Sequence, residues 1–240
     1  MIGEACSRMA LDILEGLRRA VELILSGDPS VLDATLRSLY VSGAATFLAS
    51  ILGLPIGMII GSREFPGRRL LRGFFNALLG IPTVGLGLIL YLILSRSGPL
   101  GALRMLYTPS AMILGQALLV LPILVSFTAN AVENVEREIK DLSKTLGASE
   151  LQASLTVFRE ALPSVSLAVI AGFNRALAEL GVALMLGGNI AGLTRVLTTT
   201  IAMEATRGNI ELSIALTIIL LSIVFALSSA ANVLKEKLEG

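Results

Sequence analysis

Five apolar stretches dominate this sequence, and each is long enough to cross a lipid bilayer as a helix. They cover approximately residues 36–61, 74–94, 107–129, 164–187 and 210–234. The hydrocarbon core of a bilayer is about 30 Å thick, and about 20 helical residues span it. Because the backbone in lipid must satisfy its own hydrogen bonds, such stretches form helices. The sequence therefore predicts an all-α, polytopic membrane protein with about five transmembrane helices.

The composition supports a membrane protein and argues against several other classes of protein. With 54% hydrophobic and 15% charged residues and a mean hydropathy of +0.82, the chain is too apolar for a soluble domain of 240 residues. A net charge of +1 without a long basic run does not indicate nucleic-acid binding. One cysteine excludes an internal disulfide, and the lack of histidine removes the commonest metal ligand and general base. We predict no metal site and no catalytic residue.

Residues 1–30 differ from the five stretches because charged residues interrupt them throughout. Their apolar residues leave a polar face opposite an apolar one, which is typical of a helix that lies on the membrane surface. A cleavable secretory signal would need an unbroken apolar core. We expect an amino-terminal interfacial segment over residues 1–30 and a five-span core over residues 36–234, within a single transmembrane domain that covers residues 1–240.

A polar insert separates the third and fourth apolar stretches and must lie outside the bilayer. It begins in effect at Asn130 and ends at Pro163, and its most distinctive part is the run 141–163. Apolar residues recur there at helical spacing around Gly147, namely Leu142, Leu146, Leu151, Leu155 and Phe158. This pattern predicts two short amphipathic helices that meet at the glycine. Such a hairpin needs a partner for its apolar stripe.

The basic residues in the loops indicate the orientation of the chain. If the insert lies inside, the inner side holds ten of them: Arg63, Arg68, Arg69, Arg72, Arg137, Lys140, Lys144, Arg159, Lys235 and Lys237. The two outer loops hold only Arg96, Arg104, Arg195 and Arg207. Cytoplasmic loops carry an excess of Lys and Arg. We therefore expect the amino terminus outside and the carboxyl terminus in the cytoplasm.

The insert also carries a family resemblance. The run Thr145-Leu146-Gly147-Ala148-Ser149, followed by Leu162-Pro163, resembles the cytoplasmic coupling loop of permease subunits in ATP-driven uptake transporters. Two departures are that Asp141-Leu142-Ser143 stands where that family has Glu-Ala-Ala, and that Pro163 lies farther from the glycine. The longer spacing and the runs 76–103 and 172–209 resemble the tungstate-uptake branch of the molybdate and sulfate permeases. The resemblance covers roughly residues 36–225.

This resemblance implies the fold of a type I ABC importer permease and its partners. The chain would act as a homodimer with two ATP-binding subunits on its cytoplasmic face and an extracellular oxyanion-binding protein, in the cytoplasmic membrane. It has no Gly-x-x-x-x-Gly-Lys-Ser/Thr run, so ATP and Mg are expected on the partner and no cofactor on this chain. By the resemblance, the residues that couple to the ATPase are Thr145, Leu146, Gly147, Ala148, Ser149, Glu150 and Leu151.

Polar residues within the apolar stretches are candidates for the translocation path. Arg175 and Glu179 lie four residues apart, so in a continuous helix they share one face and can pair. Charges at membrane depth cost about 2.5–3.5 kcal/mol each and normally face a bundle interior or a wet cavity. They either line the path or form a structural ion pair. Hydroxyl donors that could guide an oxyanion, or bond their own helix instead, are Thr83, Thr198, Thr199 and Thr200.

Several alternatives remain open at this point. Molybdate or sulfate could replace tungstate as the transported anion. In a different class, an ion-coupled carrier or channel would work without ATP, although the chain shows no obvious duplicated halves. An intramembrane hydrolase would need an activated nucleophile, which the sequence does not place. The glycines at four-residue spacing, Gly53, Gly57 and Gly61, allow close helix packing either within the chain or between two copies.

Overall fold

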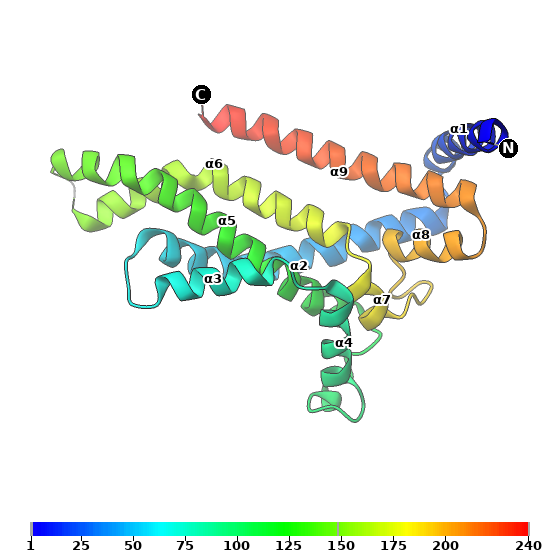
Figure 1. Cartoon of the computed structure of the whole chain (residues 1–240), viewed down its shortest axis with the longest axis horizontal. Helices are drawn as coiled ribbons and strands as arrows, with labels where there is room; N and C mark the ends of the chain where they lie inside the picture. Colours follow the sequence, from blue (N-terminus) through cyan, green and yellow to red (C-terminus); the bar gives the residue numbers. More distant parts are fainter. Residues whose placement is uncertain (1, 148, 240) are drawn as a thin grey trace. The chain divides into compact units, whose positions relative to one another are not determined.

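The computed structural model describes the backbone of residues 2–147 and 149–239, and it is helical (Figure 1). Side chains are described in these ranges except at 2–12, 136–141, 143–144, 150–151, 153–154, 158, 231 and 234–239. The helices are α1 (Ile2–Ser26), α2 (Pro29–Ser62), α3 (Arg68–Leu78), α4 (Thr83–Leu94), η1 (Gly101–Leu103), α5 (Pro109–Thr145), α6 (Glu150–Leu177), α7 (Gly181–Gly187), α8 (Leu197–Thr206) and α9 (Ile210–Glu239).

The described helices account for the five predicted spans. Three segments are long and apolar enough to cross a membrane on their own: Pro29–Ser62, Pro109–Val135 and Ile210–Ala230. Two further spans arise if each of two bent helix pairs is counted as one, which gives up to five. One pair joins α3 to α4 across a 97° bend, and the other joins Arg159–Leu177 to α7 across a 57° bend. The all-α polytopic class is thus confirmed.

The first of these bends follows from local sequence. Gly80, Ile81 and Pro82 separate α3 from α4. Proline lacks the backbone donor that a helix interior requires, and it disfavours helical geometry in the residue before it. The break therefore lies inside the second apolar stretch. Pro55 lies within the continuous helix α2.

The polar insert differs from its prediction. It does not form two separate short helices, because the helices that flank it continue into it. Helix α5 runs unbroken for 37 residues to Thr145, and α6 runs for 28 residues through Pro163. No glycine or proline lies between Pro122 and Gly147 to stop α5 earlier. The predicted meeting point at Gly147 is correct.

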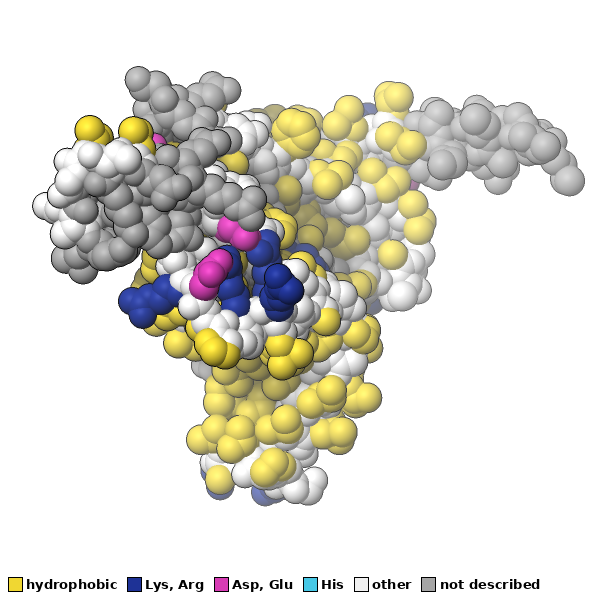
Figure 2. Space-filling model, turned by 60° about the vertical axis from the view of Figure 1, so that its left-hand side comes forward, with side chains coloured by type: hydrophobic (Ala, Val, Ile, Leu, Met, Phe, Trp, Pro, Cys, Tyr) yellow, Lys and Arg dark blue, Asp and Glu magenta, His cyan; other side chains and the backbone are white. Residues whose placement is uncertain are grey.

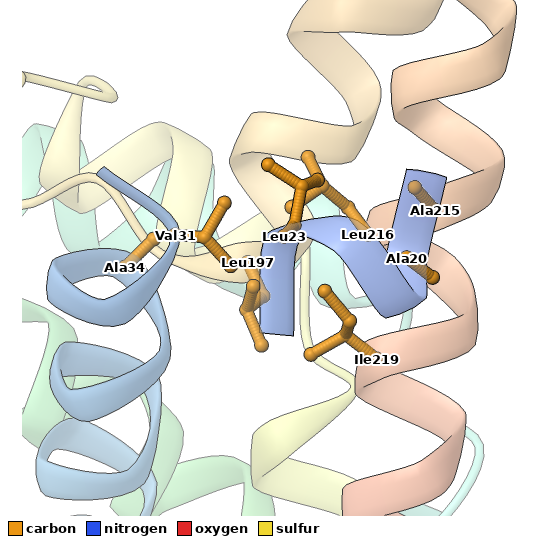
Figure 3. Close-up of a cluster of buried hydrophobic side chains, with 8 residues drawn as sticks. All are labelled: Ala20, Leu23, Val31, Ala34, Leu197, Ala215, Leu216 and Ile219. Atoms are coloured by element: carbon orange, nitrogen blue, oxygen red, sulfur yellow. The ribbon is translucent and has the colours of Figure 1, made fainter. Parts of the chain in front are cut away.

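Helix α1 packs one face into a hydrophobic cluster, as expected for an amphipathic helix. Its Ala20 and Leu23 lie beside Leu216 and Ile219 of α9, together with residues of α2 and α8 (Figure 3). At Gly16 the helices approach so closely that an added Cβ would lie 2.3 Å from Ile214 Cγ2. Leucines on other faces of α1 remain exposed. The helix is predicted to lie on the membrane surface, which stays a prediction.

Asp28 separates α1 from α2 by capping the second helix. Its Oδ1 accepts hydrogen bonds from the backbone N–H of Ser30 at 2.9 Å and of Val31 at 3.2 Å. These are donors that a helix start leaves unpaired. The Ser30 hydroxyl, which also donates to Oδ1, and these backbone groups hold the pKa of Asp28 below its ordinary value. The stabilisation by this cap is therefore present at neutral pH and is lost as the pH falls through that lowered pKa.

Contacts divide the chain into two compact units. The first contains residues 1–42, 83–115 and 177–226, and the second contains residues 43–82, 116–176 and 227–240. In the second unit, α5 and α6 lie side by side (Figure 1), with Ala131 and Val132 of α5 packed against Val157, Ala161 and Val165 of α6. This apolar seam holds the two arms of the polar insert together.

The three spaced glycines of α2 pack against α5 in the same unit. A Cβ added to Gly53 would lie 2.9 Å from Leu124 Cβ. One added to Gly57 would lie 2.7 Å from Thr128 Cβ, and one added to Gly61 would lie 2.7 Å from Val132 Cβ. Real Cβ atoms essentially never approach so closely. The glycine stripe therefore serves packing within the chain, where small residues let two helix backbones approach.

Candidate functional site

The loop between α5 and α6 forms a tight, exposed turn. Helix α5 ends at Thr145, whose hydroxyl donates to the Leu142 carbonyl oxygen at 2.7 Å. Gly147 then takes φ +84°, a left-handed conformation that residues with a Cβ rarely adopt. Open space surrounds its Cα, so the backbone conformation and not crowding requires glycine here. Ala148, a predicted coupling residue, lies outside the described residues.

A capping box begins α6 directly after this turn. The Ser149 backbone N–H donates to Gln152 Oε1 at 2.9 Å, and the Gln152 N–H donates to Ser149 Oγ at 3.4 Å. This reciprocal pair satisfies two donors that the helix start leaves unpaired. The sequence analysis missed the role of Gln152, although the Ser-x-x-Gln pattern is a known helix-start signal. The glycine and the box together fix where α5 ends and α6 begins.

The loop presents apolar side chains to its surroundings. Leu142, Leu146 and Leu155 are 59%, 80% and 51% exposed. Val157 and Ala161, in contrast, are buried against α5, so they hold the hairpin together rather than face outward. The side chains of Leu151, Phe158 and Glu150 lie outside the described ones. The hairpin is thus held together by one apolar seam and exposes leucines near its tip.

Three of the predicted path residues gather in the first unit. The Thr198 hydroxyl donates to the backbone carbonyl oxygen of Glu179 at 2.9 Å. Thr83 lies at the start of α4, in close contact with Gly181 at the start of α7. A Cβ added to Gly181 would lie only 2.7 Å from the Thr83 Oγ1. Both Glu179 and Thr198 are buried. The starts of α4, α7 and α8 are thereby joined through side chains that sequence spacing placed far apart.

Arg175 and Glu179 do not lie in one continuous helix, which corrects the expectation drawn from their spacing. Helix α6 ends at Leu177, with Arg175 in its last turn, and α7 begins at Gly181. The Glu179 carboxylate accepts a hydrogen bond from the Val182 N–H at 3.0 Å, which caps α7. A cation in the last turn of α6 suits the negative end of its helix dipole.

Thr199 and Thr200 bond within their own segment. The Thr199 hydroxyl donates to the Val196 carbonyl oxygen at 3.0 Å and accepts from the Val196 N–H at 3.1 Å. The Thr200 hydroxyl donates to the same carbonyl oxygen at 2.8 Å. These bonds match the alternative in which threonines serve the helix backbone. They also form the start of α8.

Helices long and apolar enough to cross a membrane, two of them joined by an exposed hairpin, define a multi-pass membrane component. The chain belongs to the family of binding-protein-dependent transport system inner membrane components, whose model matches residues 53–240. It is therefore an inner-membrane permease component of an ABC importer and not an enzyme. Membership implies an ATPase and a binding protein as partners.

Two relatives narrow the comparison within this family. The chain is 40% identical to the tungstate uptake system permease protein TupB of Peptoclostridium acidaminophilum, over 94% of this chain and 99% of the relative. It is 37% identical to TupB of Campylobacter jejuni, over 95% of this chain and 96% of the relative. The family resemblance drawn from the insert and its flanking runs is thereby confirmed.

Solved structures show the same fold. An inward-facing structure of the MetNI methionine ABC transporter matches 88% of this chain and 97% of its own chain, with a TM-score of 0.73 at 16% sequence identity. At this identity the match concerns architecture alone. It agrees with the fold expected of an ABC importer permease.

Proposed function

We propose that this chain is the permease of a tungstate importer and works by alternating access as a homodimer. The main support for this proposal is the similarity of the chain to tungstate permeases along nearly its whole length. Two copies would join two ATP-binding subunits, which would hold ATP and Mg, and an external binding protein would deliver the anion. This chain would bind no cofactor. Molybdate and sulfate are the runner-up substrates, because the binding protein can set the choice of anion.

The hairpin at Gly147 is the proposed route by which ATP-driven motion reaches the membrane. Its capped turn and exposed Leu142 and Leu146 fit a contact with a groove on the ATPase subunit. The residues proposed to contact the ATPase are those of the run 145–151. The excess of Lys and Arg in the loops supports this hairpin and the carboxyl terminus in the cytoplasm, with the amino terminus outside.

The proposed path runs past the threonine and glutamate group of the first unit. Thr83 carries a neutral hydroxyl at the start of α4, a type of group that can guide an oxyanion without trapping it, and Thr198 holds the start of α8 to the backbone of Glu179. Thr199 and Glu179 then position the starts of α8 and α7 through the bonds described above. Arg175 supplies positive charge in the last turn of α6.

Reconstitution tests this function directly. The permease, its ATPase subunit and its binding protein are placed in liposomes, and entry of tungstate is measured with ATP supplied on the cytoplasmic face. We expect uptake that requires all three components and ATP. Uptake by the permease alone would contradict an ATP-driven importer. Uptake of molybdate or sulfate but not tungstate would assign the transporter to the runner-up substrates.

Arg175→Ala is expected to impair uptake while leaving the complex intact. Loss of the positive charge should slow tungstate entry about tenfold, which corresponds to about 1.4 kcal/mol in the transport barrier. Uptake and co-purification of the ATPase are measured on the same preparation. Arg175→Lys, which keeps the charge, should retain most of the uptake. Equal loss in both variants would mean that the guanidinium only braces the helix.

A further inference from the structure

Helix α3 is a short amphipathic helix placed between two spans. Its 11 residues begin after Gly67, which has φ +91°, and end before the 97° bend to α4. A helix of this length extends about 16 Å, roughly half the thickness of a bilayer core. The second apolar stretch was expected to begin at residue 74, but the first half of α3 precedes it. A short loop over residues 63–67 joins α3 to the end of α2.

Two arginines of α3 fasten it to neighbouring helices of the second unit. Arg68 Nε donates to the Ile60 carbonyl oxygen at 2.7 Å, and its Nη2 donates to that of Gly61 at 3.2 Å, which caps the end of α2. Glu133 of α5 forms ion pairs with both Arg68 and Arg72. Arg72 also donates to Asn130 Oδ1. The position of α3 on α2 and α5 is thus fixed by charged contacts.

Two further arginines stand beside this arrangement with exposed side chains. Arg63 and Arg69 form no ion pair with any described side chain, and both side chains are exposed. Arg69 lines a cavity of about 640 Å³ together with Arg68, Arg72, Phe65 and Leu70. Glu64 and Glu133 also line it, so its three arginines leave an excess of one positive charge. Figure 2 shows basic side chains gathered beside acidic ones on one face.

Apolar side chains of α3 flank these cations. Leu70 is 81% exposed and Phe74, one turn later, is 56% exposed. Phe75, in contrast, is buried with Ile60, Val125 and Ala129, and so anchors the inner face of the helix. A helix with arginines beside exposed leucine and phenylalanine suits the boundary between lipid headgroups and acyl chains.

With the orientation proposed above, we propose that the first turns of α3 lie in the cytoplasmic membrane interface, before the helix pair α3 and α4 enters the bilayer, and that Arg63 and Arg69 bind the phosphate groups of anionic phospholipids. Leu70 and Phe74 enter the acyl region beside these headgroups, while Arg68 and Arg72 hold the helix on α2 and α5. Charge complementarity selects anionic over zwitterionic lipid, because two cations near the surface have no described partner of their own. The site is separate from the proposed path and does not depend on which anion is transported.

Native mass spectrometry of the permease–ATPase complex, titrated with phosphatidylglycerol or phosphatidylcholine, tests this site. Each arginine near an anionic surface contributes about fivefold in affinity, so the double variant Arg63→Ala, Arg69→Ala should bind phosphatidylglycerol about 25-fold more weakly. Binding of phosphatidylcholine should not change. The matched control is Arg96→Ala, Arg104→Ala, which removes two exposed arginines of the loop after α4 and should leave phosphatidylglycerol binding unchanged.

Three outcomes would overturn the proposal. One is equal phosphatidylglycerol binding by the double variant and the unaltered complex. Another is an equal loss in the control variant, which would indicate unspecific charge effects. The third is loss of the ATPase subunit from the double variant with lipid binding retained, which would assign the surface to an acidic partner protein. Tungstate uptake in liposomes of phosphatidylcholine alone, measured separately, keeps a failure of this site distinct from a failure of the proposed function.

Discussion

Gly147→Arg is expected to abolish assembly with the ATPase subunit while the chain still inserts into the membrane. Residue 147 has φ +84°, and a side chain in such a conformation costs about 1–3 kcal/mol. Relief of this strain would shift the turn and the capping box of α6, and the guanidinium would stand beside the exposed Leu146. Co-purified ATPase should fall at least about tenfold, since every 1.4 kcal/mol lost at the contact is a factor of ten.

Two variants separate the coupling role from general damage. Gly147→Asn tolerates the left-handed conformation better than other substitutions and should retain much of the assembly. Gly192→Arg places the same side chain at another glycine of positive φ with open space around it, in a loop of the first unit, and should leave assembly intact. Normal co-purification of Gly147→Arg would argue against this hairpin as the ATPase contact.

Gly57→Ala is expected to destabilise the folded permease strongly for a change of one methyl group. Its Cβ would lie 2.7 Å from Thr128 Cβ and 2.8 Å from the Val125 carbonyl oxygen. A backbone oxygen in the middle of α5 cannot move aside cheaply, so the two helices must separate. Overpacking of this kind costs about 1–3 kcal/mol. The melting temperature in detergent, followed by size-exclusion chromatography, should fall by about 2–12 °C.

Gly73→Ala is the matched control for this effect. Gly73 lies inside α3, and a Cβ added there meets nothing within 4 Å. Alanine in a helix interior is favoured over glycine by about 0.5–1 kcal/mol, so stability should stay equal or rise. If Gly57→Ala also leaves the melting temperature unchanged, the close contact between α2 and α5 is not what holds these helices together.

Local features were predictable because they depend on the residues themselves. The apolar stretches became helices, or bent helix pairs, long and apolar enough to cross a membrane, and Gly147 became the turn of the insert. The insert was predicted less well, since the pattern of leucines does not tell whether an amphipathic helix stands alone or continues a span. The capping box at Ser149 was present in the sequence and was overlooked.

The group around Glu179 shows what spacing could not provide. Four-residue spacing predicted a shared face for Arg175 and Glu179, but α6 ends at Leu177 and Glu179 caps α7. Gly181 begins α7 in close contact with Thr83 and Val84, so the place of this break depends on the packing of α4. The bond from Thr198 to Glu179 likewise joins residues from different helices.

The sequence by itself determined a helical membrane protein with a glycine turn in a polar hairpin, because span length, apolar content and turn chemistry are properties of short segments. Only the tertiary structure decided that the Gly53, Gly57 and Gly61 stripe faces α5 and that Arg68 and Arg72 fasten α3 through Glu133. These pairings join segments that are far apart along the chain, and the close approach of helix backbones selects them.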